Sequence, residues 1–237
     1  MTEAFGLSDV GCVRSNNEDS YRIERELGLY LLADGMGGAN AGERASELAV
    51  EAVAAVFRFT PDRDAQALVK AVETANEQVR ELAKNDPQLE GMGTTLVAAL
   101  DNGEELLIAS VGDSRAYLWD GNSVRAITQD QSWVNEVGRP LGLDEASLKT
   151  HPLRNVLTMA IGASPNVVVN HYSIPWTPGS LALLSSDGLH GVVRTDKFEE
   201  ILRSKESLEE KCRRFIQAAR DAGAPDNVTA VLLRREY

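Results

Sequence analysis

Five aspartates lie where short apolar stretches of this sequence give way to glycine, asparagine or serine. They are Asp19, Asp34, Asp113, Asp187 and Asp226. Carboxylate oxygens are hard ligands, and they bind hard divalent cations such as Mg2+ and Mn2+ best. If the apolar stretches are strands that share one end, these carboxylates would repel one another unless cations lay between them. The pattern therefore predicts a site for divalent metal ions.

Glycines that directly follow two of these aspartates support a metal site. In Asp34-Gly-Met-Gly-Gly38, the lack of a side chain at position 35 would let the backbone carbonyl approach a cation. Asp187-Gly188 repeats the pattern after a second apolar stretch, and Asp226 precedes a third. One Asp-Gly pair usually marks only a turn, so the repetition carries the argument. The segment is not a phosphate-binding P-loop, because no Gly-Lys-Ser/Thr follows.

The aspartates need a scaffold, and the sequence predicts antiparallel strands. Brief apolar runs bounded by Gly, Asp or Asn are typical of buried strands. We predict such strands at residues 29–33, 95–100, 106–111, 116–119, 181–185 and 228–233. Asp101-Asn-Gly103 and Asp120-Gly121 are typical of hairpin turns, so neighbouring strands should pair antiparallel.

Three helices are predicted to cover these strands. Apolar residues at helical spacing, with charges opposite, indicate helices at about 48–57 and 68–82 that each cover a sheet face. A third helix should begin at the capping box of Ser207 and Glu210 and end at Gly223. This order of elements favours the α+β class over a doubly wound parallel sheet. We expect a single domain over residues 1–237.

Residues 129–165 differ from the rest of the sequence. Glycine and proline interrupt short helical fragments there, at Gly138, Pro140, Gly142, Pro152, Gly162 and Pro165. A segment of this length between strands is more often a functional flap than a connector, and a decorative surface insertion is the alternative.

Composition limits the partners and the compartment. The formal net charge of −12 on 237 residues argues against nucleic acid or an anionic membrane as the partner. Cys12 and Cys212 are too few for a disulfide framework, which favours a reducing cytoplasm. The first residues do not resemble a secretory signal, and no apolar run approaches the roughly 18 residues of a membrane helix. We expect a cytoplasmic monomer.

Six motifs follow one another along the chain: Arg14-x-x-Asn-Glu-Asp19, Asp34-Gly-Met-Gly-Gly38, Gly93-Thr-Thr95, Val111-Gly-Asp-Ser-Arg115, Asp187-Gly-Leu189 and Asp226-Asn-Val-Thr229. In this order they resemble the metal-dependent protein phosphatases of type 2C, in their compact bacterial form. The resemblance runs from about Gly6 to Leu233. It implies a central sandwich of two antiparallel sheets with helices outside, a four-layer α/β/β/α arrangement, with a dinuclear Mg2+/Mn2+ centre at one end. It also implies hydrolysis of phosphoserine and phosphothreonine in proteins.

The resemblance implies a set of metal ligands. Asp34 would bridge two ions, and the Gly35 carbonyl, Asp187 and Asp226 would complete direct ligation. Asp19, with Glu18, resembles the pair that holds one ion partly through water. The resemblance implies three further roles. Asp113 would bind a weaker third ion together with Asp187, and Asn227 would orient a carboxylate. Arg14 would clamp the substrate phosphate.

Elementary chemistry agrees with these roles. A water that bridges two cations has a lowered pKa and supplies hydroxide near neutral pH, so it would attack the phosphoester directly, without a phosphoenzyme. The guanidinium of Arg14 can grip two phosphate oxygens at once. An arginine that only pairs with a carboxylate is the alternative. Arg14, Asp34, Asp187 and Asp226 are therefore the residues expected to carry the reaction.

Three positions depart from the family pattern. Met36 stands where many eukaryotic relatives have a histidine proposed to protonate the leaving group, so a water or a flap residue would take that role. Gln131 replaces a histidine common in bacterial relatives, and Ser180 replaces an aspartate. We expect these two changes to affect flap docking and substrate choice rather than the reaction.

Two functions remain open on the sequence. The first is a phosphatase that opposes a bacterial serine/threonine kinase. The second is a catalytically silent relative that only binds phosphoproteins as a signalling module. Lost metal ligands would favour the second, and this chain retains all five aspartates.

Overall fold

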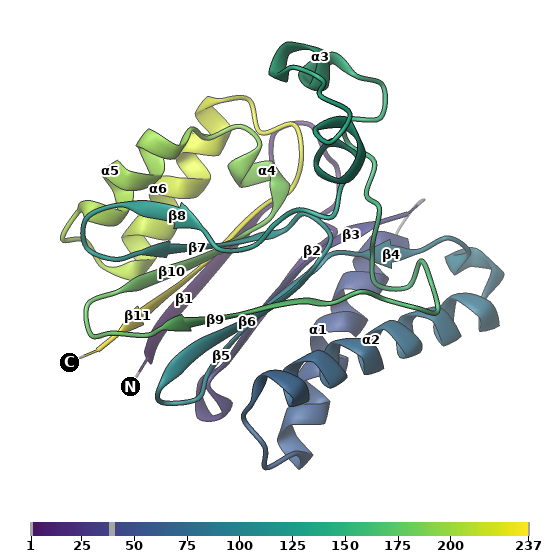
Figure 1. Cartoon of the computed structure of the whole chain (residues 1–237), viewed down its shortest axis with the longest axis horizontal. Helices are drawn as coiled ribbons and strands as arrows, with labels where there is room; N and C mark the ends of the chain where they lie inside the picture. The colour runs from purple at the N-terminus through teal and green to yellow at the C-terminus, as the bar shows by residue number, and fades with distance from the viewer. Residues whose placement is uncertain (1, 38–40, 237) are drawn as a thin grey trace.

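The computed structural model describes residues 2–37 and 41–236. In these residues, two antiparallel sheets lie face to face, with helices on both outer faces (Figure 1). Gly38, the last residue of the predicted glycine motif, lies outside the described residues.

The first sheet contains strands from both ends of the chain and from its middle. Its strand order is β1-β11-β10-β7-β8, with all neighbours antiparallel. The bounds are β1 Thr2–Asp9, β7 Arg115–Trp119, β8 Val124–Ala126, β10 Leu181–Ser185 and β11 Val228–Arg235.

The second sheet has the order β2-β3-β5-β6-β9, and a short strand, β4, pairs with the end of β3. The bounds are β2 Asp19–Glu24, β3 Leu29–Met36, β4 Gly93–Thr94, β5 Leu96–Asp101, β6 Glu105–Val111 and β9 Asn170–Pro175. The β5–β6 and β7–β8 hairpins turn at the predicted Asp-Asn-Gly and Asp-Gly sequences.

Alternate residues of the buried strands face two different cores. In β3, Leu31 packs toward the helices and Leu32 packs between the sheets. Strands with apolar layers on both faces are expected to be continuously apolar, as β3 is. Each buried leucine of this kind contributes roughly 1.5–3 kcal/mol to stability relative to an exposed one.

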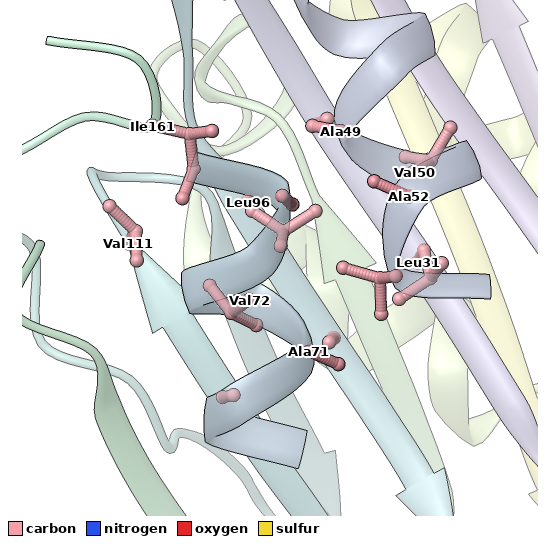
Figure 2. Close-up of a cluster of buried hydrophobic side chains, with 14 of the residues drawn as sticks. Leu31, Ala49, Val50, Ala52, Ala71, Val72, Leu96, Val111 and Ile161 are labelled. Atoms are coloured by element: carbon pink, nitrogen blue, oxygen red, sulfur yellow. The ribbon is translucent and has the colours of Figure 1, made fainter. Parts of the chain in front are cut away.

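Two helix pairs form the outer layers. Helices α1 (Ala41–Phe59) and α2 (Ala65–Asn85) cover the second sheet, and Figure 2 shows their alanines and valines against Leu31, Leu96 and Val111. Helices α5 (Thr195–Arg203) and α6 (Leu208–Asp221) cover the first sheet. The predicted α+β class and four-layer sandwich are confirmed.

The ends of the chemistry-bearing strands gather at one end of the sandwich, which we call the site end. In the second sheet, β2 starts and β3 ends there, with Asp19 opposite Asp34. In the first sheet, Ser185 at the end of β10 lies opposite Arg115 and Ala230 near the starts of β7 and β11. The predicted shared strand end is therefore present. β1 begins and β11 ends at the opposite end (Figure 1).

The chain between β8 and β9 leaves the sheets. It contains a π-helical turn at Val134–Gly138 and helix α3 (Glu145–Thr150), which lies above the sandwich in Figure 1. The ring of His151 stacks on Trp133 at 3.9 Å between centroids. Two isolated bridges, Thr94 with Ile161 and Ser132 with Leu157, close the base of this segment. The predicted flap, residues 129–165, falls within it.

Short helices complete the chain: 3-10 turns at Arg25–Leu27 and Pro87–Leu89, and α4 at Asp187–His190. The predicted capping box of α6 is present, with Ser207 Oγ accepting from the Glu210 N–H at 3.2 Å. In the described parts of the chain, no helix has both the length and the apolar character needed to span a membrane.

Candidate metal centre

Asp19 and Asp34 face each other across the β2–β3 pair at the site end. Burial, as the largest cause, and the charges of Asp187 and Asp226 together raise the pKa of Asp19 to about 7. The pKa of Asp34 lies well above its ordinary value because of burial and the charges of all four other predicted aspartates. The five carboxyls therefore belong to one electrostatic cluster.

One oxygen of Asp19 is held by the protein and the other is not. Oδ2 accepts hydrogen bonds from Ser186 Oγ at 2.7 Å and from Thr229 Oγ1 at 2.6 Å. Oδ1 is buried and has no hydrogen-bond partner among the residues that the structure describes. A buried polar atom normally has a partner, so this oxygen is suited to a water or ion.

Threonines fix the backbone around Asp34. The Asp34 N–H donates to Thr95 Oγ1 at 2.9 Å, and the Asp34 carbonyl accepts from Thr94 Oγ1 and from the Thr95 N–H, both at 2.9 Å. These bonds satisfy the main chain at the end of β3 and leave the carboxylate available for a ligand.

Gly35 is required for the packing of α1 against β3. A Cβ at this position would lie 2.1 Å from the carbonyl oxygen of Gly42 in the first turn of α1 and 2.7 Å from that of Glu18. The Gly35 N–H donates to the Glu18 carbonyl at 3.0 Å. The absent side chain thus allows α1 to approach the strand, a reason that the sequence pattern did not indicate.

Asp187 and Asp226 reach the cluster from the first sheet. Asp187 opens α4 directly after β10, and burial together with the charge of Asp226 raises its pKa. Gly188 lets the two segments touch, because a Cβ there would lie 1.9 Å from the Asn227 carbonyl oxygen.

Arg14 lies beside this pair of aspartates. Its Nη2 donates to Asp226 Oδ2 at 2.8 Å, and the side chains are 48% and 34% exposed. The charges of Asp226, Glu18 and Asp34 all raise the pKa of Arg14. A permanent, solvent-accessible cation therefore borders the acidic cluster.

Asn227 fixes the loop that carries Arg14 and Glu18. Its Oδ1 accepts from the Glu18 N–H at 2.8 Å, and its Nδ2 donates to the carbonyls of Val10 and Asn16 at 3.0 and 2.8 Å. Its backbone N–H donates to Asp226 Oδ1 at 2.9 Å. The side chain that we expected to orient a carboxylate thus orients a loop, and its main chain contacts the carboxylate.

Asp113 lies in the turn between β6 and β7. Burial, as the largest cause, and the charges of Asp187 and Asp130 together raise its pKa to about 7. Glu18, also buried, receives a hydrogen bond on Oε1 from Asn16 Nδ2 at 3.3 Å. Met36, at the end of β3, is 36% exposed.

The donor set fits hard divalent cations. Within residues 2–37 and 41–236, no three His, Cys, Asp or Glu side chains are arranged to hold an ion by themselves. Mg2+ and Mn2+ do not require this, since they take one or two carboxylates, backbone carbonyls and several waters. The donors here are oxygens, and one of them is buried with no partner among the residues that the structure describes. The crowded carboxyls have raised pKa values, which a cation would lower.

Other polar residues, to which the sequence motifs assigned no individual role, hold these aspartates in place. Ser186 and Thr229 orient Asp19. Thr95 Oγ1 accepts from the Asp34 N–H and lies 2.7 Å from Ser114 Oγ. Ser180, in contrast, lies in the turn before β10, where it binds Thr177 at the end of the sandwich away from the site. The expectation that Ser180 affects the flap was wrong.

Comparisons with known proteins agree with this geometry. The protein phosphatase 2C family model matches residues 13–233. The serine/threonine phosphatase stp of Listeria welshimeri is 36% identical over 236 residues, which cover 96% of this chain and 94% of that protein.

Two solved structures have the same fold. The serine/threonine phosphatase PstP of Mycobacterium tuberculosis is 35% identical with a TM-score of 0.90, and the match covers 100% of this chain and 99% of that one. The catalytic domain of PstP in complex with two manganese ions is 33% identical, with a TM-score of 0.86 and coverage of 98% and 97%. The chain is a member of the protein phosphatase 2C family of serine/threonine protein phosphatases, which are hydrolases.

Proposed function

We propose that this chain hydrolyses phosphoserine and phosphothreonine in proteins, using two Mg2+ or Mn2+ ions held at the site end. The observation that carries the proposal is the convergence of five carboxyls, four of them with raised pKa values, next to an accessible arginine. A cluster of like charges is costly unless a ligand of opposite charge binds it. The related PstP structure with two manganese ions supports the choice of metal.

The ligand roles follow the position of each group. Asp34 lies opposite Asp19 in the β2–β3 pair, and its carboxyl contacts that of Asp187 from the first sheet; it is the proposed bridge between the ions. Asp187, Asp226 and the Gly35 carbonyl complete direct ligation. Asp19, whose Oδ1 is unpartnered in the described residues, binds through water with Glu18. Asp113 serves a third, weaker ion.

Arg14 is the proposed phosphate clamp. One of its nitrogens, Nη2, contacts Asp226, and a guanidinium carries five N–H donors in a planar fork. The remaining donors suit two phosphate oxygens. When bound, the cations would supply a water of lowered pKa as the nucleophile and would neutralise charge on the phosphoryl group. Met36 has no proton to donate, so the leaving group takes its proton from solvent or from a flap residue.

The biological setting is proposed from composition and relatives. We place the chain in the cytoplasm as a monomer that reverses the action of a serine/threonine kinase on phosphoproteins. The two sheets share one core, and we treat residues 1–237 as one catalytic domain that includes the flap. The net charge of −12 favours protein substrates over nucleic acid or anionic membranes.

An assay with p-nitrophenyl phosphate tests the function. We expect turnover that requires Mn2+ or Mg2+, is lost on chelation, and is abolished in Asp187→Ala. A matched control is Asp101→Asn, an aspartate at the opposite end of the sandwich, which should retain turnover. Metal-independent turnover, or full activity in Asp187→Ala, would contradict the mechanism. No turnover with any divalent ion would favour the silent phosphoprotein-binding module.

We also propose that the flap selects substrates. Its base borders a cavity of about 420 Å3, close to Asp113, whose pKa Asp130 raises. The lining is mostly polar: Arg115, Ala126, Thr128, Gln129, Asp130, Asn135, Glu136 and Asn170. Replacing residues 129–165 by the flap of a relative should change the ranking of phosphopeptides while p-nitrophenyl phosphate turnover stays similar. An unchanged ranking would count against this role.

A further inference from the structure

A second cavity, of about 650 Å3, lies beside the end of β3 on the helical side of the second sheet. The last turns of α2, the 3-10 turn after it and the end of the flap form its walls. In Figure 1, the chain leaves α2 and returns to β4 beside the end of β3. Two cations, Arg80 and Lys84, line this cavity together with one carboxylate, Glu90.

The cavity is close to the proposed metal centre. Met92 lies in its wall, and a Cβ on Gly37 would lie 3.3 Å from Met92 Cα. Gly37 comes three residues after Asp34. Three residues of extended chain span roughly 10 Å, so Met92 lies within about 15 Å of Asp34. An extended peptide covers that distance in about five residues.

A buried amide fixes the flap side of the cavity. Asn76 of α2 is 1% exposed. Its Oδ1 accepts from the Gly162 N–H at 2.8 Å, and its Nδ2 donates to the Ser164 carbonyl at 2.9 Å. Gly162 has a φ of +90°, and a Cβ there would lie 2.6 Å from Val79 Cγ1. The last part of the flap is therefore held close against α2, and the wall has a defined shape.

The two cations of this cavity have no ion-pair partner in the part of the chain that the structure describes. Arg58 and Arg214, in contrast, each pair with two carboxylates. Arg80 is half-buried and Lys84 is exposed, and they lie one turn apart on the same face of α2. Because the lining contains only one carboxylate, it has a net positive charge on a chain whose net charge is −12.

We propose that this cavity is a subsite for an acidic side chain of the protein substrate, about five residues from the phosphoserine or phosphothreonine at the metal centre. The inference rests on the proposed function and names the substrates that it favours: phosphoproteins with an aspartate or glutamate at that separation. The ammonium of Lys84 and the guanidinium of Arg80 bind the carboxylate, and complementary charge gives the selectivity.

A carboxylate fits this subsite better than a second phosphate does. Arg80, Lys84 and Glu90 together carry one net positive charge, which a single negative charge balances. A phosphate dianion would be repelled more strongly by Glu90. Both cations belong to α2, so this preference is separate from selection by the flap.

Steady-state kinetics with a series of phosphothreonine peptides test the subsite. The peptides share one neutral sequence and carry a single glutamate at successive positions on either side of the phosphothreonine. For the wild type with Mn2+ we expect kcat/KM to rise about fivefold when the glutamate is about five residues away on one side, as for a favourable, partly exposed ion pair. The gain should come mainly from KM and shrink at high salt.

Matched variants assign the gain to the two cations. Arg80→Gln/Lys84→Gln keeps much of each side-chain stem and should lose the gain, whereas Glu90→Gln should increase it. Lys84→Glu, at an exposed position, should make the same peptide a poorer substrate than the neutral one. Lys70→Gln makes one of these charge changes on α2 about 21 Å from Lys84 and should rank the peptides as the wild type does. All variants should turn over p-nitrophenyl phosphate equally, because it is too small to reach the cavity.

The outcomes separate this inference from the proposed function. A gain that persists in Arg80→Gln/Lys84→Gln, or a wild type without a preferred position, would overturn the subsite, while Mn2+-dependent turnover of p-nitrophenyl phosphate would still support the phosphatase. A larger gain from phosphoserine than from glutamate at the preferred position would overturn the assignment to a carboxylate. If no substrate is turned over with any divalent ion, the proposed function fails and the inference fails with it.

Discussion

The two ends of the sandwich use aspartate in opposite ways. At the end away from the site, Asp101 Oδ2 accepts from Arg235 Nη1 at 3.0 Å and from Thr2 Oγ1 at 2.7 Å, and its side chain is 9% exposed. Arg234 pairs with Glu3 at the same end. Each of these carboxylates has a protein cation beside it.

At the site end, carboxylates face one another. Burial and the charges of four other aspartates raise the pKa of Asp34. Arg14 pairs with Asp226 there, at the exposed rim. The difference shows that charge compensated within the protein serves stability, whereas charge left for a ligand marks function.

The largest expected effect comes from removing the proposed bridging ligand. Asp34→Asn should lower kcat/KM for phosphopeptides on the order of a thousandfold, because several kcal/mol of transition-state stabilisation depend on correctly held ions. The metal-free variant should be at least as stable as the wild type, since one repelling charge is gone. Steady-state kinetics and urea unfolding check the two halves. If Asp34→Asn lost stability but retained activity, the proposed difference between the two ends of the sandwich would be wrong.

Arg14→Ala should have the next largest effect. Losing a bidentate contact to phosphate should lower kcat/KM about 10- to 100-fold, mainly through KM. Arg14→Lys keeps the charge but not the fork and should recover only part of the loss. If the wild type and Arg14→Ala had equal kinetics, Arg14 would not bind phosphate and would only pair with a carboxylate.

Asp101→Asn should affect stability and not activity. The substitution keeps the shape of the side chain but removes the charge that pairs with Arg235. We expect a loss of about 1–2 kcal/mol in the free energy of unfolding, because the pair is largely buried. Urea denaturation measures this loss, and p-nitrophenyl phosphate turnover at saturating Mn2+ should match the wild type. A catalytic defect here would show that the two ends do not act separately.

The smallest effect is a pH dependence that metal should reverse. Asp19 and Asp113 have folded pKa values of about 7, above those of unfolded aspartate, so the folded metal-free protein binds more protons than the unfolded chain between about pH 4 and 7. Its free energy of unfolding should therefore fall as the pH rises through this window.

Urea unfolding at pH 5.5, 7 and 8.5 with chelator measures this trend. Saturating Mn2+ should invert it, because ions bind only the deprotonated carboxylates. Metal-free stability that rises steadily with pH would contradict the raised pKa values.

The sequence predicts the strands that are buried on both faces. β3, β5, β6, β10 and β11 are continuous apolar runs, and their ends carry the aspartates. β1 and β2 carry no such run, because each is only partly buried. Helix α5 is nine residues long, with a buried face of Phe198, Ile201 and Leu202 that is too short to give a clear helical period.

The candidate site, like the fold, can be predicted from the sequence only in part. Repeated Asp-Gly pairs after apolar runs identify Asp34 and Asp187 from sequence alone. The partners of Asp19 have no such signal, since Ser186 and Thr229 are 167 and 210 positions away along the chain. Serine and threonine recur throughout the sequence, so only the assembled sheets distinguish these two. The flap base, where Gln131 binds Gly112, is likewise visible only in three dimensions.

Calorimetric titration of Asp34→Asn with Mn2+ tests the central claim most directly. If Asp34 bridges two ions at the site end, this single change should remove tight binding of both, while Asp101→Asn binds Mn2+ as the wild type does. Wild-type stoichiometry and affinity in folded Asp34→Asn would contradict the account, because the acidic cluster would then not be the metal centre.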